Sequence, residues 1–231
     1  MRVRVTTTAL GITAALLAVP ACSTDTVGNK PDTTSSARTG KSANAAQTAA
    51  PLASATLETR LLDPSDLGSG YLRKQERPTQ HDDVDVIGCP ALSELGGDAA
   101  TGGTLTFPHK AKAAFTYGGS SSEVAEELYS ASANKLSDGI GRIFDAMTGC
   151  PTYQVVSGGT PIDMASQKLP APRGLGDEQW SQLLTFSTAG RSTVVKQTAI
   201  RKGSLLVIVS GSPALVDRHL DKALAKATTT S

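Results

Sequence analysis

The sequence predicts an α+β domain, in which an antiparallel β-sheet carries helices packed on one face, with one disulfide and a disordered tether in front. Three observations predict this class. The last third of the chain holds five short β-branched runs separated by Gly or Pro, which is typical of an antiparallel meander. Amphipathic segments precede and follow these runs instead of alternating with them, which favours an α+β arrangement. The N-terminal stretch is rich in Ser, Thr and Ala, so it cannot bury enough apolar surface to fold.

The chain begins with a segment typical of export. Met1 to Arg4 is basic, Thr8 to Val19 is apolar apart from small residues, and the segment ends in Val-Pro-Ala-Cys at Cys22. This ending resembles the lipobox of bacterial lipoproteins. The resemblance implies a signal peptide over 1–21, a diacylglyceryl group on Cys22, and a protein anchored by lipid to the extracellular face of the cell membrane. The alternatives are an ordinary secretory signal and an uncleaved anchor, although the apolar stretch is shorter than the roughly 20 residues of a membrane-spanning helix.

Composition then divides the rest of the chain into two parts. Residues 22–56 are predicted to form the lipidated, disordered linker, and residues 57–231 a single α+β domain of ordinary size. The chain has 22 basic and 21 acidic residues, and removing Arg2 and Arg4 with the signal leaves 20 basic residues. This near-neutral balance gives no reason to expect a nucleic-acid partner.

Two further cysteines, Cys89 and Cys150, lie in the predicted domain. Each stands in a Gly-Cys-Pro sequence, which favours a turn. In an exported protein such a pair is interpreted first as a disulfide, which would be worth about 4 kcal/mol in the chain-entropy model. The alternative of free or catalytic thiols has no neighbouring His or CxxC motif to support it.

The first elements of the domain are short. Leu61 to Leu67 is predicted to contain a helix with Asp63 as N-cap, followed by a strand from Tyr71. A single helical turn is expected at 90–95, between Cys89 and paired glycines.

The middle of the domain is predicted to be extended and then helical. Residues 105–107 and 111–117 have the character of strands. Ser120 to Glu123 fits a capping box, and apolar residues recur at helical intervals from Val124 to Met147. The sequence therefore predicts one long helix, or two with a break near 137–139, ending at the second cysteine.

The last third is predicted to be a meander closed by a helix. The predicted strands are 152–156, 162–169, 179–188, 192–201 and 205–210. Ser212 and Pro213 then begin an amphipathic helix. Its predicted inner side is Leu215, Val216, Leu220 and Leu224, with His219 on the solvent side.

No assembled catalytic motif, metal site or cofactor fingerprint is recognised, so no catalytic residues, no metal and no cofactor are expected. Ser132 to Lys135 matches the S-x-x-K pattern of penicillin-recognising enzymes, but the serine falls inside a predicted helix and no K-T-G follows. His81, Asp82, Asp83 and Asp85 have the composition of a cation-binding loop, yet acidic loops are more often simply solvated.

One loop, over 168–180, has the composition of a ligand contact. It carries Arg173 and the single tryptophan, Trp180, and an exposed indole beside a guanidinium would suit a sugar or a protein partner. The alternative is that Trp180 points inward and closes the core, since the domain has few aromatic side chains.

The order of elements resembles the extracellular sensor domains related to the PknH kinase sensor of mycobacteria, which also occur as free lipoproteins in actinobacteria. The resemblance covers most of the domain, although this chain has one cysteine pair where the kinase sensor has two. The matching segments are Leu61 to Tyr71, Cys89, Cys150, Leu175 to Glu178, and the strand at 205–210 with the helix after it. The resemblance implies a ligand held between helices and a curved sheet.

Together, these features predict an actinobacterial lipoprotein that is a noncatalytic binding or sensing module of the cell envelope. Its partners would be the membrane, through the lipid, and a small molecule, glycan or envelope protein. The alternatives are a carrier of lipid or glycolipid and a hydrolase that acts on the cell wall.

Overall fold

The computed structural model describes residues 50–75, 84–96, 107–119 and 122–229. All of them belong to one compact unit, which spans Asn44–Ser231. In chain order its elements are α1 (Ser54–Glu58), α2 (Pro64–Leu67), β1 (Tyr71–Arg73), β2 (Val84–Ile87), α3 (Pro90–Glu94), β3 (His109–Tyr117), β4 (Glu123–Ser130), α5 (Ala133–Gly149), β5 (Thr152–Ser157), β6 (Thr160–Lys168), β7 (Glu178–Thr188), β8 (Arg191–Lys202), β9 (Leu205–Gly211) and α6 (Pro213–Ala227).

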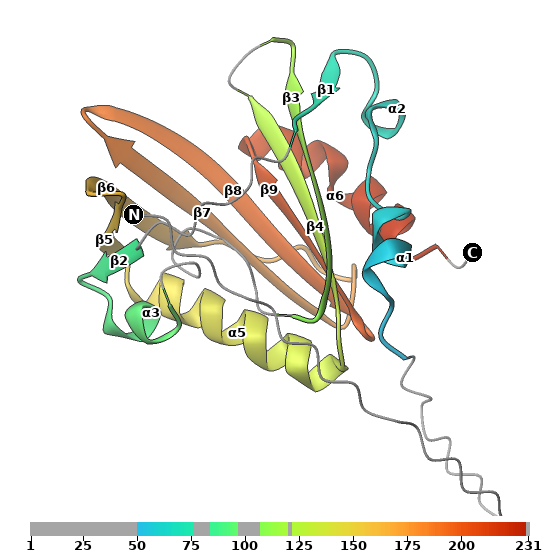
Figure 1. Ribbon diagram of the computed structural model, residues 1–231, viewed down its shortest axis with the longest axis horizontal. Helices are drawn as coiled ribbons and strands as arrows, with labels where there is room; N and C mark the ends of the chain where they lie inside the picture. Colours follow the sequence, from blue (N-terminus) through green and yellow to red (C-terminus); the bar gives the residue numbers. More distant parts are fainter. Residues whose placement is uncertain (1–49, 76–83, 97–106, 120–121, 230–231) are drawn as a thin grey trace, which may run out of the picture. The chain divides into compact units, whose positions relative to one another are not determined.

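The nine described strands form one antiparallel sheet in the order β1-β3-β4-β9-β8-β7-β6-β5-β2 (Figure 1). Strands β5 to β9 pair in sequence as a meander, because short connections let each strand fold back on its predecessor. The predicted α+β class, with its antiparallel sheet and five late strands, is therefore confirmed. Strands β1 and β2, which are adjacent along the chain, lie at opposite edges of the sheet.

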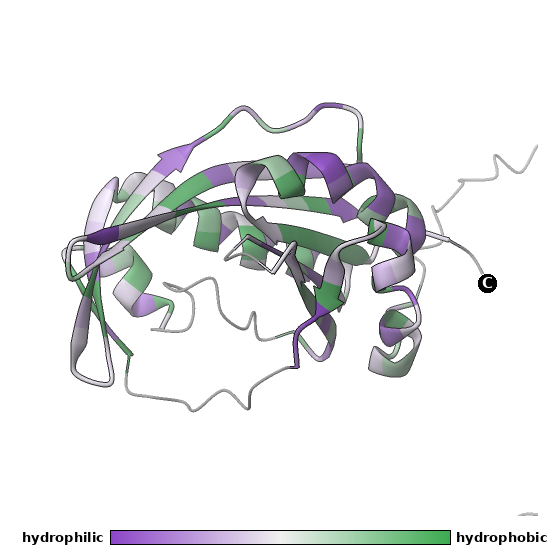
Figure 2. Ribbon diagram, turned by 90° about the horizontal axis from the view of Figure 1, so that it is seen from above, coloured by the Kyte–Doolittle hydropathy of each residue, from purple (hydrophilic) through white to green (hydrophobic). Residues whose placement is uncertain are grey.

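The two long helices lie on opposite faces of the sheet, whereas the sequence predicted helices on one face (Figure 1). Alternate residues of β9 show this division. Leu205, Val207 and Val209 pack in the core cluster that contains α6, and Leu206 and Ile208 pack in the cluster that contains α5. The continuous apolar run of β9 is the sequence signal of a strand that is buried on both faces. Figure 2 shows the central strands as largely hydrophobic, beside the mixed surface of α6.

The segment before β1 packs against the sheet on the α6 side. Leu57, Leu61 and Leu62 are all under 5% exposed in that core. The packing begins inside the stretch predicted to be linker, because α1 starts at Ser54 and the Leu52 N–H donates to Ser130 Oγ at 2.8 Å. Asp63 caps α2 as predicted, with a reciprocal capping box.

Residues 123–130 form strand β4 instead of the predicted helix. The apolar positions Val124 and Leu128 are four residues apart, a spacing that fits both a helical face and alternate residues of a strand. Pairing with β3 on one side and β9 on the other decides for the strand. The helix starts only at Ala133, and from there to its end at Gly149 the prediction is correct.

The predicted disulfide between Cys89 and Cys150 is present, with their Cα atoms 5.7 Å apart. It joins the N-cap of α3 to the C-cap of α5. Cys89 is 1% exposed and lies among Leu92, Met147 and Tyr153 in a separate core cluster. The bond therefore fixes the small helix and the edge strand β2 to the end of the sheet that α6 does not cover.

Candidate ligand site

The two residues predicted to bind a ligand lie in different surroundings. Trp180, on β7, is half-buried against Phe144 of α5, with 6.4 Å between the ring centroids. This is the inward position that the alternative interpretation expected. Arg173 is exposed in the loop before β7, and no cation–π contact joins it to Trp180 in the described part of the chain. A ligand-binding role for this pair stays a prediction.

Several other predicted site residues lie outside the described residues. These are Cys22, His81, Asp82 and Asp83, so lipidation and cation binding by the acidic loop are not tested. Asp85 is exposed on β2. Within the described ranges, no three or more His, Cys, Asp or Glu side chains are grouped as a metal site would require.

The sequence predicted Ser132 of the S-x-x-K pattern inside a helix, but the structure does not place it inside one. Because residues before it belong to β4, Ser132 becomes the N-cap residue of α5. Both Ser132 and Lys135 are exposed, and the serine side chain makes no capping hydrogen bond.

An open hollow lies where β1 ends beside β3, and we call it the β1–β3 hollow. Its volume is about 350 Å³. It forms because β1 stops at Arg73 while β3 continues to His109, so the two segments separate. Among the described residues, the backbone bond between them nearest the hollow runs from the Lys74 N–H to the Ala114 carbonyl at 2.8 Å. The lining residues are Arg73, Lys74, Gln75, Lys112, Ala113 and Ala114.

Carboxylates of the neighbouring strand β4 hold two of the lining cations. Lys74 Nζ lies 2.6 Å from Glu123 Oε1, and Lys112 Nζ lies 2.9 Å from Glu127 Oε2. The Lys112 ammonium also lies 5.9 Å from the centre of the Tyr129 ring, within the range of a cation–π contact. These contacts fix the lysine positions, while neither carboxylate lines the hollow.

A second open hollow, of about 430 Å³, lies at the β5–β6 end of the sheet. Two of its polar side chains already satisfy each other, since Gln154 Nε2 donates to Asp163 Oδ1 at 3.0 Å. Burial raises the pKa of Tyr153 in its wall to about 12, so this phenol stays neutral. The β5–β6 hollow therefore offers a ligand fewer unsatisfied groups than the β1–β3 hollow.

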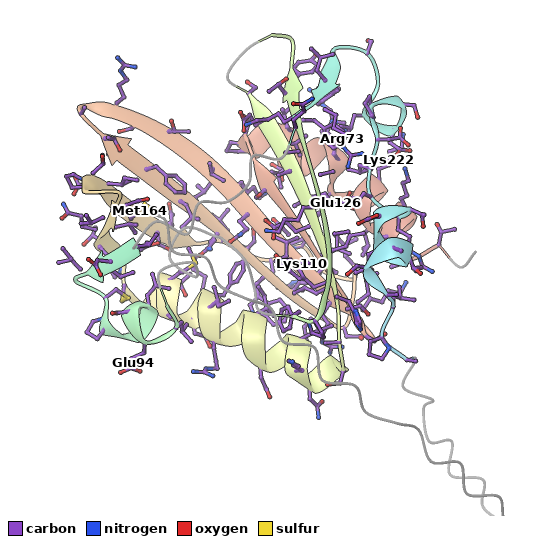
Figure 3. The ribbon with its side chains drawn as sticks, in the orientation of Figure 1. Arg73, Glu94, Lys110, Glu126, Met164 and Lys222 are labelled. Carbon is purple, nitrogen blue, oxygen red and sulfur yellow. A yellow bond between two sulfur atoms is a disulfide. The ribbon has the colours of Figure 1, made fainter. Side chains whose placement is uncertain are left out.

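A carboxyl with a strongly raised pKa lies inside the core, away from both hollows. Glu126 of β4 is 1% exposed, and its Oε2 accepts the Leu62 N–H at 2.6 Å (Figure 3). Its Oε1 has no hydrogen-bond partner among the described residues. Burial raises the pKa of Glu126 to about 7, against the opposing effects of the Leu62 N–H and of Lys226.

His219 is buried, whereas the sequence placed it on the solvent side of the last helix. It is 5% exposed, and its Nε2 lies 2.6 Å from the Tyr71 hydroxyl. The helical spacing explains this position, because His219 lies four residues after Leu215 and four before Ala223, both of which are in the core. Burial lowers the pKa of His219, and the charges of Arg218 and Lys222 lower it further.

Comparison with solved structures identifies a similar fold. This chain is similar to the extracellular domain of PknH from Mycobacterium tuberculosis. The TM-score is 0.57 at 14% sequence identity, over 77% of this chain and 97% of that domain. A second structure, of an uncharacterised protein from Mycobacterium smegmatis, has 13% identity over 73% of this chain and 84% of that one, but its TM-score of 0.36 is too low to indicate a shared fold. No protein-family model and no curated protein matches the chain.

The similarity to PknH confirms the architecture that the resemblance implied. The β1–β3 hollow, in contrast, was missed by sequence reasoning. The sequence predicted a strand at 111–117, and β3 extends it back to His109, so that both Lys110 and Lys112 lie on this strand. Their alternation was a usable signal, because residues two apart on a strand point to the same face. The cations that complete the hollow come from β1 and the residues after it, which only the sheet pairing brings close.

Proposed function

We propose that this protein is a lipid-anchored, noncatalytic binding or sensing module on the outer face of a bacterial cell membrane. The observation that carries the proposal is the β1–β3 hollow, an open site at a sheet edge whose lining includes three basic residues, Arg73, Lys74 and Lys112. The described lining contains no Ser, Cys, His, Asp or Glu, and both of its lysines pair with carboxylates of β4, which favours binding over nucleophilic or acid–base chemistry. The fold similarity to the extracellular domain of PknH supports the same class of function.

The disulfide supports the proposed location. Structural disulfides persist in oxidising compartments outside the cytoplasm, and the Cys89–Cys150 bond joins a buried Cys89 to a half-buried Cys150 within one core cluster. The lipobox-like segment supplies the anchor in this proposal, with two acyl chains on Cys22 giving stable attachment where a single chain would not. None of the described helices combines the length and the apolarity needed to cross a bilayer.

Two experiments test the proposal. The first compares incorporation of a palmitate analogue between the wild-type chain and Cys22→Ala in an actinobacterial host, and we expect label only on the wild type. The second measures the melting temperature of the full chain with and without a small-molecule extract of the cell envelope, and we expect stabilisation by mass action.

Four results would count against the proposal. Equal labelling of both chains would contradict lipidation of Cys22. An unchanged melting temperature would contradict binding of a ligand from the extract. Turnover of peptidoglycan fragments or of an ester panel would make the protein a hydrolase. Extraction of a stoichiometric lipid from the purified chain would favour the carrier alternative.

A further inference from the structure

Residues 50–67 lie across the face of the sheet that carries α6, and we call this segment the N-terminal strap. The Lys110 N–H of β3 donates to Ser54 Oγ near the start of the strap, at 3.1 Å. Four strap side chains are buried in the core cluster that contains α6, namely Leu57, Leu61, Leu62 and Leu67. The strap therefore covers apolar side chains of β3 and β4, and it joins the domain to the residues before it.

Glu126 lies on β4 beneath the strap, in apolar surroundings. Its cross-strand partners are Ala113 of β3 and Val209 of β9, and its neighbours on the same face of β4 are Val124 and Leu128. Glu126 Oε2 accepts the Leu62 N–H of the strap at 2.6 Å, while Oε1 has no hydrogen-bond partner among the described residues. A carboxyl in such surroundings is favoured in its neutral form, because a buried charge without partners is costly.

The strap and α6 also meet through an ion-pair cluster beside Glu126. Lys226 Nζ lies 2.9 Å from Asp63 Oδ2 and pairs with Asp66 as well. Hydrogen bonds from Ser65 and Lys226 hold the pKa of Asp63 well below its usual range. Burial opposes the charge of Lys226, but its hydrogen bonds to Asp66 and Asp63 raise its pKa above the ordinary value. Asp63 and Lys226 therefore both stay charged between pH 5 and pH 8.

Three further charged or titratable groups of the strap and α6 have partners other than Glu126. They are Arg60, Lys222 and His219, whose respective partners are the Ala227 carbonyl, the Asp66 carbonyl and the Tyr71 hydroxyl. Arg60 Nε is buried without a hydrogen-bond partner, and within the described residues no ion pair joins it to Glu126. An ionised Glu126 would thus be a buried charge without a direct counter-ion, which is strongly destabilising.

We propose that Glu126 is a pH-sensitive contact of the N-terminal strap, which is closed over β4 while the carboxyl is protonated and opens more often once the proton is lost. On opening, the carboxyl releases its proton to water and is hydrated as a carboxylate, and water replaces it on the Leu62 N–H. Opening also uncovers the apolar side chains around Glu126 and lengthens the connection between the domain and the preceding chain. This inference goes beyond the proposed function and needs no lipid on Cys22.

The size and direction of the effect follow from the two states of Glu126. Burial raises the pKa of Glu126 to about 7 in the closed state, against an ordinary value of 4.5 when the strap is open. The carboxyl therefore stabilises the closed state fully below about pH 4.5, and this contribution is lost as the pH rises to 7. Between pH 5 and pH 8 the equilibrium constant for opening should increase about 70-fold.

The test is native-state hydrogen exchange of the full chain at several pH values, in low concentrations of urea and with rates corrected for intrinsic exchange. Two amides report on the strap, because Leu57 and Leu67 donate to carbonyls within it. Val207 of the central strand β9 reports on global unfolding. We expect the strap amides to be less protected than Val207 and almost independent of urea, as in a local opening. Their protection should fall about 70-fold from pH 5 to pH 8.

Two variants separate Glu126 from the other titratable groups. In Glu126→Gln, which imitates the protonated acid and leaves His219 in place, the protection of the strap should change little with pH. Glu58→Gln removes an exposed carboxyl from α1 of the same strap, so it is the matched control and should follow the wild type.

Three results would overturn the inference. The first is strap amides with the protection and urea dependence of Val207, since the strap would then not open separately. The second is strap protection in the wild type that stays constant or rises with pH, a result that is decisive even if Glu126→Gln does not fold. The third is an equal fall in Glu126→Gln and the wild type, which would assign the pH dependence to another group.

Discussion

Replacing Glu126 with Gln should make the stability of this domain less sensitive to pH. The Glu126 carboxyl is almost fully buried, and its pKa is raised from 4.5 to about 7 in the folded chain. A folded-state pKa above the unfolded value means that the folded chain keeps a proton that the unfolded chain releases. The stabilising contribution of Glu126 is therefore complete below about pH 4.5 and is lost as the pH rises through 7.

The size of the effect follows from the shift. At about 1.36 kcal/mol for each pKa unit, the raised pKa corresponds to about 3 kcal/mol between pH 4.5 and pH 8. Gln imitates the protonated acid, since its oxygen can accept the Leu62 N–H as Glu126 Oε2 does. The difference in unfolding free energy, Gln variant minus wild type, should therefore increase by about 3 kcal/mol over this range.

The assay is urea unfolding of both chains at several pH values from about 4.5 to 8. Glu94→Gln is the matched control, because Glu94 is exposed on α3 and its replacement should leave the pH profile parallel to that of the wild type (Figure 3). Parallel curves for wild type and Glu126→Gln would refute the reasoning. If the unfolding free energy of the Gln variant minus that of the wild type decreased as the pH rose, Glu126 would be ionised in the folded chain and stabilised by Lys226.

Three further substitutions test the backbone and the disulfide. Replacing Cys89 and Cys150 together by Ser should lower the unfolding free energy by about 4 kcal/mol, because the disulfide joins two residues that are 61 positions apart in the chain. The melting temperature of the double variant should be the same with and without reductant. A double variant that melts at the same temperature as the wild type would contradict this prediction. Gly211→Ala should destabilise strongly, by at least about 2 kcal/mol in chemical unfolding, since its φ is +136° and an added Cβ would lie 2.1 Å from the Glu123 carbonyl oxygen. Gly141→Ala, in contrast, meets open space in the middle of α5 and should stabilise by about 1 kcal/mol. Similar values for the two glycine variants would mean that the contact at Gly211 is relieved in solution.

The sequence by itself determined the local elements whose signals have one structural meaning. Asp63 before Pro64 can cap a helix, the late β-branched runs can only return on themselves across their short turns, and two cysteines in an exported domain have each other as partners. These predictions needed no knowledge of distant contacts.

Only the tertiary structure decided the features that depend on which surfaces meet. The segment at 123–130 satisfies both helical and strand spacing, and its pairing with β3 and β9 made it a strand. The environment of His219 was set by Tyr71, which lies 148 residues earlier in the chain. The β1–β3 hollow likewise combines β1 with β3, two segments whose proximity comes from the sheet pairing alone. Periodicity indicates which faces of a segment are apolar. Burial depends on which other segment covers each face, and this is determined by the fold of the whole chain.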